Sequence, residues 1–276
     1  ETNDNNNDDD DDDDAFFDPD QFHVKLDPRT IAYKPPDYNI LRPLFGWLST
    51  DIIKQTFEHT TQYARLPHGT QLKRVFRSSN PALNVVRRNE SVACDIVYAD
   101  TPAVDNGSQI ATIFTGLDTQ VTDIYGMHAD RQFVNTLEDN IRYRGAPTRL
   151  VSDRAQVEIS QKVLDILRTL CIGDWQSEPH QQQQNPAERR YQTVKNTANR
   201  IMDRTGAPPY TWLLCLTYVC FLLNHTYNAS IGDVPMNRLT GSTVDISVLL
   251  KFHFWQRVYY KKVEPGFPSI SSEALG

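Results

Sequence analysis

The fold is decided by residues 91–127, which read "SVACDIVYADTPAVDNGSQIATIFTGLDTQVTDIYGM". Three runs in this stretch are rich in β-branched and aromatic residues, and the turn residues "DNG" and "LD" separate them. We therefore predict three consecutive strands, at residues 91–99, 109–117 and 119–127, that are joined by hairpin connections.

Helical and extended patterns alternate after residue 127. Residues 130–147 have their apolar side chains at helical spacing, with Asp130 at the expected cap, and Gly145 followed by Pro147 ends the pattern. The order of elements predicts an α/β fold whose mixed sheet has helices on its faces. The remaining predicted elements are a short strand at 148–153 and helices at 160–172, 185–206 and 212–223.

Charge is unevenly distributed along the chain. The net charge is −7, but residues 1–20 hold eleven acidic residues and no Lys or Arg, so the remainder carries +4. A tract of this kind repels itself and has little to bury, so we predict a disordered acidic leader at residues 1–20. The rest of the chain is mildly basic, which is compatible with a nucleic-acid partner.

Cysteine usage and hydropathy restrict the compartment. The four cysteines are scattered and form no C-x-x-C pair, which argues against a disulfide framework and fits a reducing compartment. The most apolar run, residues 212–223, is too short to span a bilayer, and no signal-peptide pattern is present. We expect no membrane partner and no secretion. Because the chain starts at Glu1 without a methionine, we expect it to be a piece of a longer polypeptide.

Three carboxylates stand at informative points of the predicted elements. Asp95 lies inside the first strand, Asp153 at the end of the fourth, and Glu188 near the start of a helix. Strand ends and a helix start that face one sheet edge can converge. Carboxylates around one point repel each other unless cations lie between them, and oxygen ligands with room for water suit Mg²⁺. A pair of such ions can activate an attacking oxygen and stabilise a leaving oxygen in phosphoryl displacement.

The segment around Glu188 reads "EPHQQQQNPAERRYQTVK", residues 178–195, and it has two interpretations. With Asn185 as the cap and Pro186 as the first helical residue, Glu188 would complete a capping box. Alternatively, Glu188 carries chemistry. The two interpretations compete, because a carboxylate folded back onto its own cap cannot also reach a metal ion.

Polar residues of the same helix are candidates for contact with nucleic acid. Glu188 shares its helix face with the residues four before it and four and seven after it, which are Gln184, Gln192 and Lys195, provided that the helix extends back to Gln184. Arg189 lies directly beside Glu188. The neighbouring Arg190 adds positive charge suited to phosphate binding. A solvated helix face is the other interpretation. The predicted DNA-binding residues are Gln184, Arg189, Gln192 and Lys195.

Several ordered motifs resemble one family. The stretch "LVSDRAQ", followed about thirty-five residues later by "PHQQQQNPAERRYQTVKNTANRIM", resembles the D,D-35-E integrase core of retroviruses and LTR retrotransposons. It is most similar to the Copia group, in which the third acid sits in a Q-N-G-x-A-E-R setting. Residues 94–118 resemble that family's first strand and hairpin, and residues 206–260 resemble the Copia segment that follows the core.

The resemblance implies an RNase H-like fold with a mixed five-stranded sheet, and an integrase that catalyses metal-dependent DNA strand transfer. Asp95, Asp153 and Glu188 would be the catalytic acids and would hold two Mg²⁺ (or Mn²⁺) ions, with no small-molecule cofactor. Asp100 is an alternative first acid, but we favour Asp95 because it lies in mid-strand. A DNA 3′-hydroxyl would attack a target phosphodiester without a covalent protein intermediate.

The same resemblance implies partners and a location. DNA, as element ends and as target, would be the partner, and the protein would act as a homo-multimer. It would be synthesised in the cytoplasm as part of a polyprotein and act in the nucleus on chromosomal DNA. The expected parts are the leader at 1–20, a helical or irregular N-terminal region at 21–87, the catalytic core at 88–235 and a partial C-terminal extension at 236–276 with the β-rich "FHFWQRVYY".

The sequence departs from the family pattern at three points, one of which is that thirty-four residues separate Asp153 from Glu188, one fewer than usual. The second motif usually reads S-D-N-G, whereas here Arg154 and Ala155 follow Asp153. The family's N-terminal zinc module uses two His and two Cys, but no Cys precedes Cys94 and Trp47 stands where a His is expected, so we predict no zinc. These departures support an alternative: a catalytically decayed or domesticated integrase-like domain of a polyprotein that binds nucleic acid.

Overall fold

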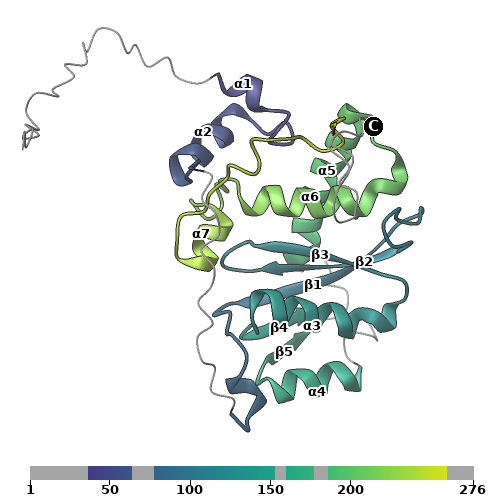
Figure 1. Ribbon diagram of the computed structural model, residues 1–276. Coiled ribbons are helices and arrows are strands. Elements are labelled where there is room, and N and C mark those ends of the chain that lie inside the picture. The colour runs from purple at the N-terminus through teal and green to yellow at the C-terminus, as the bar shows by residue number, and fades with distance from the viewer. Residues whose placement is uncertain (1–36, 64–77, 153–159, 177–185, 260–276) are drawn as a thin grey trace, which may run out of the picture. The chain divides into compact units, whose positions relative to one another are not determined.

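The computed structural model describes residues 37–63, 78–152, 160–176 and 186–259, all of which belong to one compact unit. Its centre is a five-stranded sheet in the order β3-β2-β1-β4-β5 (Figure 1). β1 to β3 form an antiparallel meander, whereas β4 and β5 run parallel to β1. The strands are β1 Ser91–Tyr98, β2 Ile110–Gly116, β3 Thr122–Met127, β4 Arg149–Ser152 and β5 Gly173–Gln176.

Helices cover both faces of this sheet, so the predicted mixed five-stranded sheet flanked by helices is confirmed. α3 and α4 lie on one face, and α5 and α6 lie on the other (Figure 1). The helices are α1 Tyr38–Leu41, α2 Thr50–His59, α3 Phe133–Arg144, α4 Gln161–Thr169, α5 Pro186–Thr205, α6 Trp212–Asn224 and α7 Pro235–Thr240.

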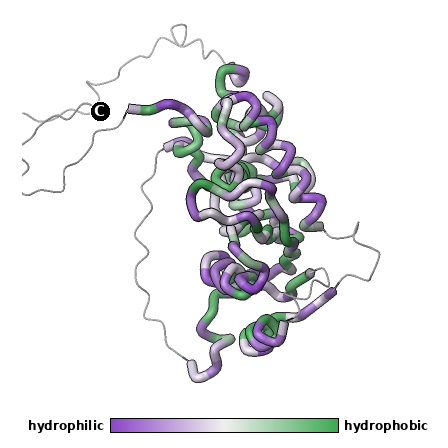
Figure 2. Tube along the Cα trace, turned by 90° about the vertical axis from the view of Figure 1, so that its right-hand side faces the viewer, coloured by the Kyte–Doolittle hydropathy of each residue, from purple (hydrophilic) through white to green (hydrophobic). Residues whose placement is uncertain are grey.

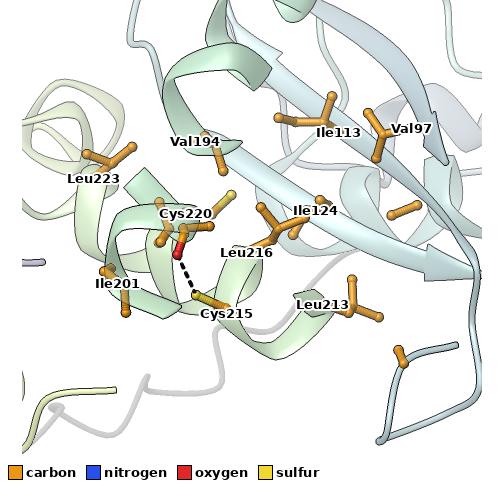
Figure 3. Close-up of a cluster of buried hydrophobic side chains, with 14 residues drawn as sticks. Val97, Ile113, Ile124, Val194, Ile201, Leu213, Cys215, Leu216, Cys220 and Leu223 are labelled. Atoms are coloured by element: carbon orange, nitrogen blue, oxygen red, sulfur yellow. Dashed lines mark hydrogen bonds between the residues drawn. The ribbon is translucent and has the colours of Figure 1, made fainter. Parts of the chain in front are cut away.

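The alternation of side chains along β1 builds two cores. Val92 and Cys94 point to the α3 and α4 side, whereas Val97 belongs to the α5 and α6 side. Figure 3 shows the second core, where Leu216 of α6 and Val194 of α5 meet the sheet. In Figure 2 the helices alternate between hydrophobic and hydrophilic colour along their turns, as helices with one buried face do.

The N-terminal helices pack with distant parts of the chain. Phe45 and Ile53 share a buried cluster with Leu222 of α6 and with Ile246. Ser49 caps α2, because its side chain accepts a hydrogen bond from the Ile52 N–H at 3.4 Å. The predicted leader at 1–20 lies outside the described residues, and the proposed domain boundaries stay a prediction.

Two local expectations were wrong. Asp130 does not cap α3, because residues 130–132 form a 3₁₀ turn and the helix begins at Phe133. The β-rich residues 252–259 form no strand; instead, Phe254 packs its ring 5.5 Å from that of Tyr218. Aromatic β-propensity is therefore overridden there by a tertiary contact.

None of the described helices combines the length and the apolar character needed to cross a membrane. The cysteines are all free; Cys94, Cys215 and Cys220 are buried and Cys171 is exposed. Burial raises the pKa of the Cys215 thiol to about 12, so this cysteine is held as an unreactive thiol.

Candidate active site

Asp95 lies in the middle of β1 on the face that α5 covers. It alternates with Cys94, which faces the opposite core, and it is half-buried. One carboxylate oxygen accepts a hydrogen bond from the Ile96 N–H at 2.9 Å. The strand therefore fixes the position of a carboxylate that retains access to solvent.

The first turn of α5 is held against β1 and β4. Ala187 is fully buried with Ala93 of β1 and Val151 of β4, and Leu117 packs against the three. Ala93 is also the parallel-ladder partner of Val151. This pair is the last of the β1–β4 ladder; it lies one residue before Ser152, the end of β4, and two residues before Asp95. The end of β4 and the start of α5 thus meet β1 at the height of Asp95.

Glu188 follows Ala187 directly and is exposed in the first turn of α5. The described part of α5 begins at Pro186, and a carboxylate in a first turn is favoured by the helix dipole. Asn185 lies outside the described residues, so the capping interpretation of Glu188 stays open.

Asp95 and α5 are linked electrostatically through Tyr191. Burial first, and the negative charge of Asp95 second, raise the pKa of the Tyr191 phenol above its ordinary value. Tyr191 lies three residues after Glu188 and therefore on a neighbouring part of the helix surface. Asp95 therefore lies on the side of α5 that carries Tyr191, about one helical turn from Glu188.

Of the other predicted site residues, Asp100 is described, whereas Asp153 and Gln184 are not. Asp100 is exposed and follows the end of β1 at Tyr98, so the strand runs about 10 Å past Asp95 before reaching it. Asp153 and Gln184 lie outside the described residues. The described site thus contains two of the three predicted catalytic acids.

The predicted DNA-binding residues of α5 form an exposed surface. Gln192 and Lys195 lie about 40° and 20° around the helix from Glu188, as 3.6 residues per turn require, and both are exposed. Arg189 is exposed beside them. This surface is open to solvent next to the two carboxylates, as contact with a polymer would need.

Arg190 departs from expectation. Instead of adding charge to that surface, its side chain crosses to the turn between β2 and β3, where Nε donates to Thr122 Oγ1 at 3.0 Å and Nη2 to the Gln120 carbonyl at 3.4 Å. Sequence spacing could have indicated this, because Arg190 lies on the buried side of α5 with Ala187 and Val194.

A second arginine interaction was also missed. Arg88 is buried and ion-paired with Glu90. Glu90 also accepts hydrogen bonds from the Thr119 N–H at 2.9 Å and from the Thr119 hydroxyl at 2.7 Å, which fixes the β2–β3 turn. The spacing of two residues between Arg88 and Glu90, which puts both side chains on one side of an extended segment, could have indicated this ion pair.

The two described acids offer ligands of the kind that a divalent cation needs. Asp95 and Glu188 offer carboxylate oxygens, one half-buried and one exposed, which is the ligand chemistry of Mg²⁺. Within residues 37–63, 78–152, 160–176 and 186–259, no three His, Cys, Asp or Glu side chains come together as a metal site would require. The two described acids fit a metal ion but do not complete its site.

One hollow among the described residues lies elsewhere. It measures about 600 Å³ and is lined by Ile141 of α3, Ile166 of α4 and Val86, among others. These helices cover the face of the sheet opposite to α5, so this hollow is separate from Asp95 and Glu188.

Comparisons with known proteins give a structural likeness only. No family model and no curated protein matches the sequence. The chain is similar to the HTLV-2 integrase catalytic core domain in complex with magnesium. The dimeric form has a TM-score of 0.44 and 12% identity over 57% of this chain and 98% of that one. The trimeric form has 0.44 and 12% over 55% and 96%. The catalytic core domain of BIV integrase has 0.44 and 13% over 55% and 95%.

Proposed function

We propose that this chain contains the catalytic core of a Copia-type retrotransposon integrase, which joins one DNA to another by metal-dependent strand transfer. The observation that carries the proposal is the meeting of β1, β4 and α5. Ala93, Val151 and Ala187 pack together, and each is followed within two residues by one of the three proposed catalytic acids.

The proposed site consists of Asp95, Asp153 and Glu188. Asp153 directly follows Ser152, the last residue of β4, which supports its inclusion. These carboxylates would hold two Mg²⁺ or Mn²⁺ ions. When bound, the ions would stabilise the charge that develops on the attacking and leaving oxygens.

The chain's own residues would bind and orient the DNA. Arg189 and Lys195 would bind phosphates by charge, and Gln192 would hydrogen-bond to the backbone or to bases. The reaction would be a direct transesterification: a bond forms between the 3′-oxygen of element DNA and the target phosphorus, and a target 3′-hydroxyl leaves. The exposure of Glu188 and the half-burial of Asp95 leave an open site that suits a duplex.

Assembly and location belong to the same proposal. A strand-transfer enzyme joins two element ends to one target, so we propose that the protein acts as a homo-multimer. Its substrate would be chromosomal DNA, which places its action in the nucleus after synthesis in the cytoplasm.

The test is a strand-transfer assay with the complete 276-residue chain, a labelled duplex carrying a free 3′-hydroxyl and a target plasmid. Joined product that appears with Mg²⁺ or Mn²⁺ and disappears with chelator is the expected result. Binding of DNA that weakens with salt, but without any metal-dependent joining or nicking, would instead identify a domain that has lost catalysis.

A further inference from the structure

Arg190 joins the first turns of α5 to the turn between β2 and β3. Its Nε donates to the Thr122 hydroxyl at 3.0 Å, and its Nη2 donates to the Gln120 carbonyl at 3.4 Å. Both acceptors lie about seventy residues earlier in the chain. The contact is therefore a tertiary link between the helix that carries Glu188 and the hairpin of the sheet.

The acceptors of Arg190 are themselves held in place. Gln120 has a left-handed backbone with φ of 61°, and its carbonyl also accepts from the Thr122 hydroxyl at 3.1 Å. The buried Asn224 side chain forms two hydrogen bonds with the backbone of Thr122. Its amide oxygen accepts from the Thr122 N–H and its amide nitrogen donates to the Thr122 carbonyl, each at 2.8 Å. Arg190 thus reaches a rigid point, at which α5, α6 and β3 meet.

Among the described residues, no carboxylate pairs with Arg190, whereas nearby Arg144 is paired with both oxygens of Asp123 at 2.6 and 2.8 Å. Burial lowers the pKa of the Arg190 guanidinium, which records the loss of water around its charge. A partly buried cation without a counter-ion contributes little to stability compared with an apolar side chain of similar size.

The direction of Arg190 also separates it from the exposed surface of α5. At 3.6 residues per turn, its side chain leaves the helix about 160° from that of Glu188. The two side chains therefore point to opposite sides of the same turn. Contact of Arg190 with a DNA phosphate on the side of Lys195 would require the helix to detach from the hairpin.

We infer that Arg190 is a positioning residue, which fixes the rotation and depth of the first turns of α5 and thereby places the Glu188 carboxylate opposite Asp95. This role rests on the proposed function of Glu188. The link between α5 and the β2–β3 hairpin can be measured by amide hydrogen exchange, which does not depend on strand-transfer activity. Removing Arg190 leaves no orphaned acceptor, since the Thr122 hydroxyl and the Gln120 carbonyl remain bonded to each other.

The experiment compares Arg190→Met and Arg190→Lys with wild type in the complete chain. Arg200→Met serves as the matched control, because Arg200 is exposed further along α5. Amide hydrogen exchange is followed over residues 186–195, together with the melting temperature. Strand transfer is measured in parallel as a function of Mn²⁺ concentration.

In R190M we expect exchange over residues 186–195 to accelerate on the order of tenfold or more, since a charge-assisted link is lost, with an unchanged melting temperature. R190K should retain part of the protection, and R200M all of it. Strand transfer by R190M should fall about 100-fold at saturating Mn²⁺, as expected when a reacting group is displaced by about 1 Å.

The outcomes test two claims separately: the positioning role of Arg190 and the proposed strand-transfer function. Exchange in R190M equal to wild type would overturn the inference. Accelerated exchange with wild-type strand transfer would also overturn it, since the link would then not position Glu188. Accelerated exchange in a protein whose wild type shows no strand transfer would leave the link established, overturn its catalytic purpose and contradict the proposed function.

Discussion

The Asp95 carboxylate lies close enough to Tyr191 to contribute to the raised pKa of its phenol. This relationship connects the middle of β1 to α5 one turn after Glu188. It gives the described part of the candidate site a measurable electrostatic signature that does not depend on catalysis.

Replacing Asp95 with Asn should lower the pKa of Tyr191. The negative charge that opposes ionisation of the phenol is removed, while the larger effect, burial, remains. The pKa should therefore fall but stay above the ordinary value of about 10. Titration of Tyr191 by NMR with ring-labelled tyrosine measures it. An unchanged Tyr191 pKa in D95N would show that the two groups do not face each other.

The Asp123–Arg144 ion pair should contribute to stability far more than the Asp139–Arg142 pair. The first is largely buried, with exposed side-chain fractions of 13% and 11%, whereas the second has 54% and 76%. We expect Asp123→Asn to cost about 3 kcal/mol in the free energy of unfolding, because Arg144 is left buried and unpaired. Asp139→Asn should cost less than about 1 kcal/mol. Equal losses in urea denaturation would refute this ranking.

His225 should make stability depend on pH. Burial lowers its pKa, against the raising effect of the hydrogen bond between Nδ1 and the Phe221 carbonyl; the charge of Arg144 lowers the pKa and that of Asp123 raises it. The folded state then resists protonation that the unfolded chain accepts below about pH 6.5. The contribution of neutral His225 to stability is complete above that pH, and it is lost as the pH falls through the pKa of His225 in the folded state.

The His225 effect is isolated by His225→Gln, which keeps a neutral hydrogen-bond donor. Unfolding free energies are compared from about pH 7 to about pH 5. Wild type should lose stability more steeply than H225Q over this interval. Parallel curves for the two proteins would exclude His225 as a source of the pH dependence.

Lys195 should contribute one ionic contact to DNA binding. In Lys195→Met the slope of the logarithm of affinity against the logarithm of salt concentration should become shallower by about one. Lys162→Met is the control, because Lys162 is exposed on α4, which covers the opposite face of the sheet. The prediction fails when both variants change the slope equally or neither changes it.

Much of the fold follows from residue patterns. The runs at 91–127 predicted three strands because β-branched residues alternate between turns, and the helix at 133–144 ends at Gly145, whose φ of 100° suits a residue without a side chain. By contrast, no local pattern located β5, since Gly173–Gln176 contains only one strongly β-favouring residue. Its pairing with β4 is a long-range interaction that the sequence implied only through family resemblance.

The candidate site was predictable in part. Asp95 and Glu188 were located by their positions in a strand and at a helix start, and the described part of α5 begins at Pro186. The direction of Arg190 was not predicted, because charge alone suggested a surface contact with DNA. Helical spacing places Arg190 on the buried side of α5, but its acceptors belong to a hairpin about seventy residues away, which local spacing does not identify.

The central claim is that Asp95 of β1, and not Asp100 beyond it, is the catalytic acid that faces Glu188. The most direct measurement is metal-dependent strand transfer by wild type, Asp95→Asn, Asp100→Asn and Glu188→Gln under identical conditions. We predict that D95N and E188Q each lose activity by on the order of 10²–10³-fold or more, while D100N stays within a few-fold of wild type. Unchanged activity in D95N or E188Q would contradict the account.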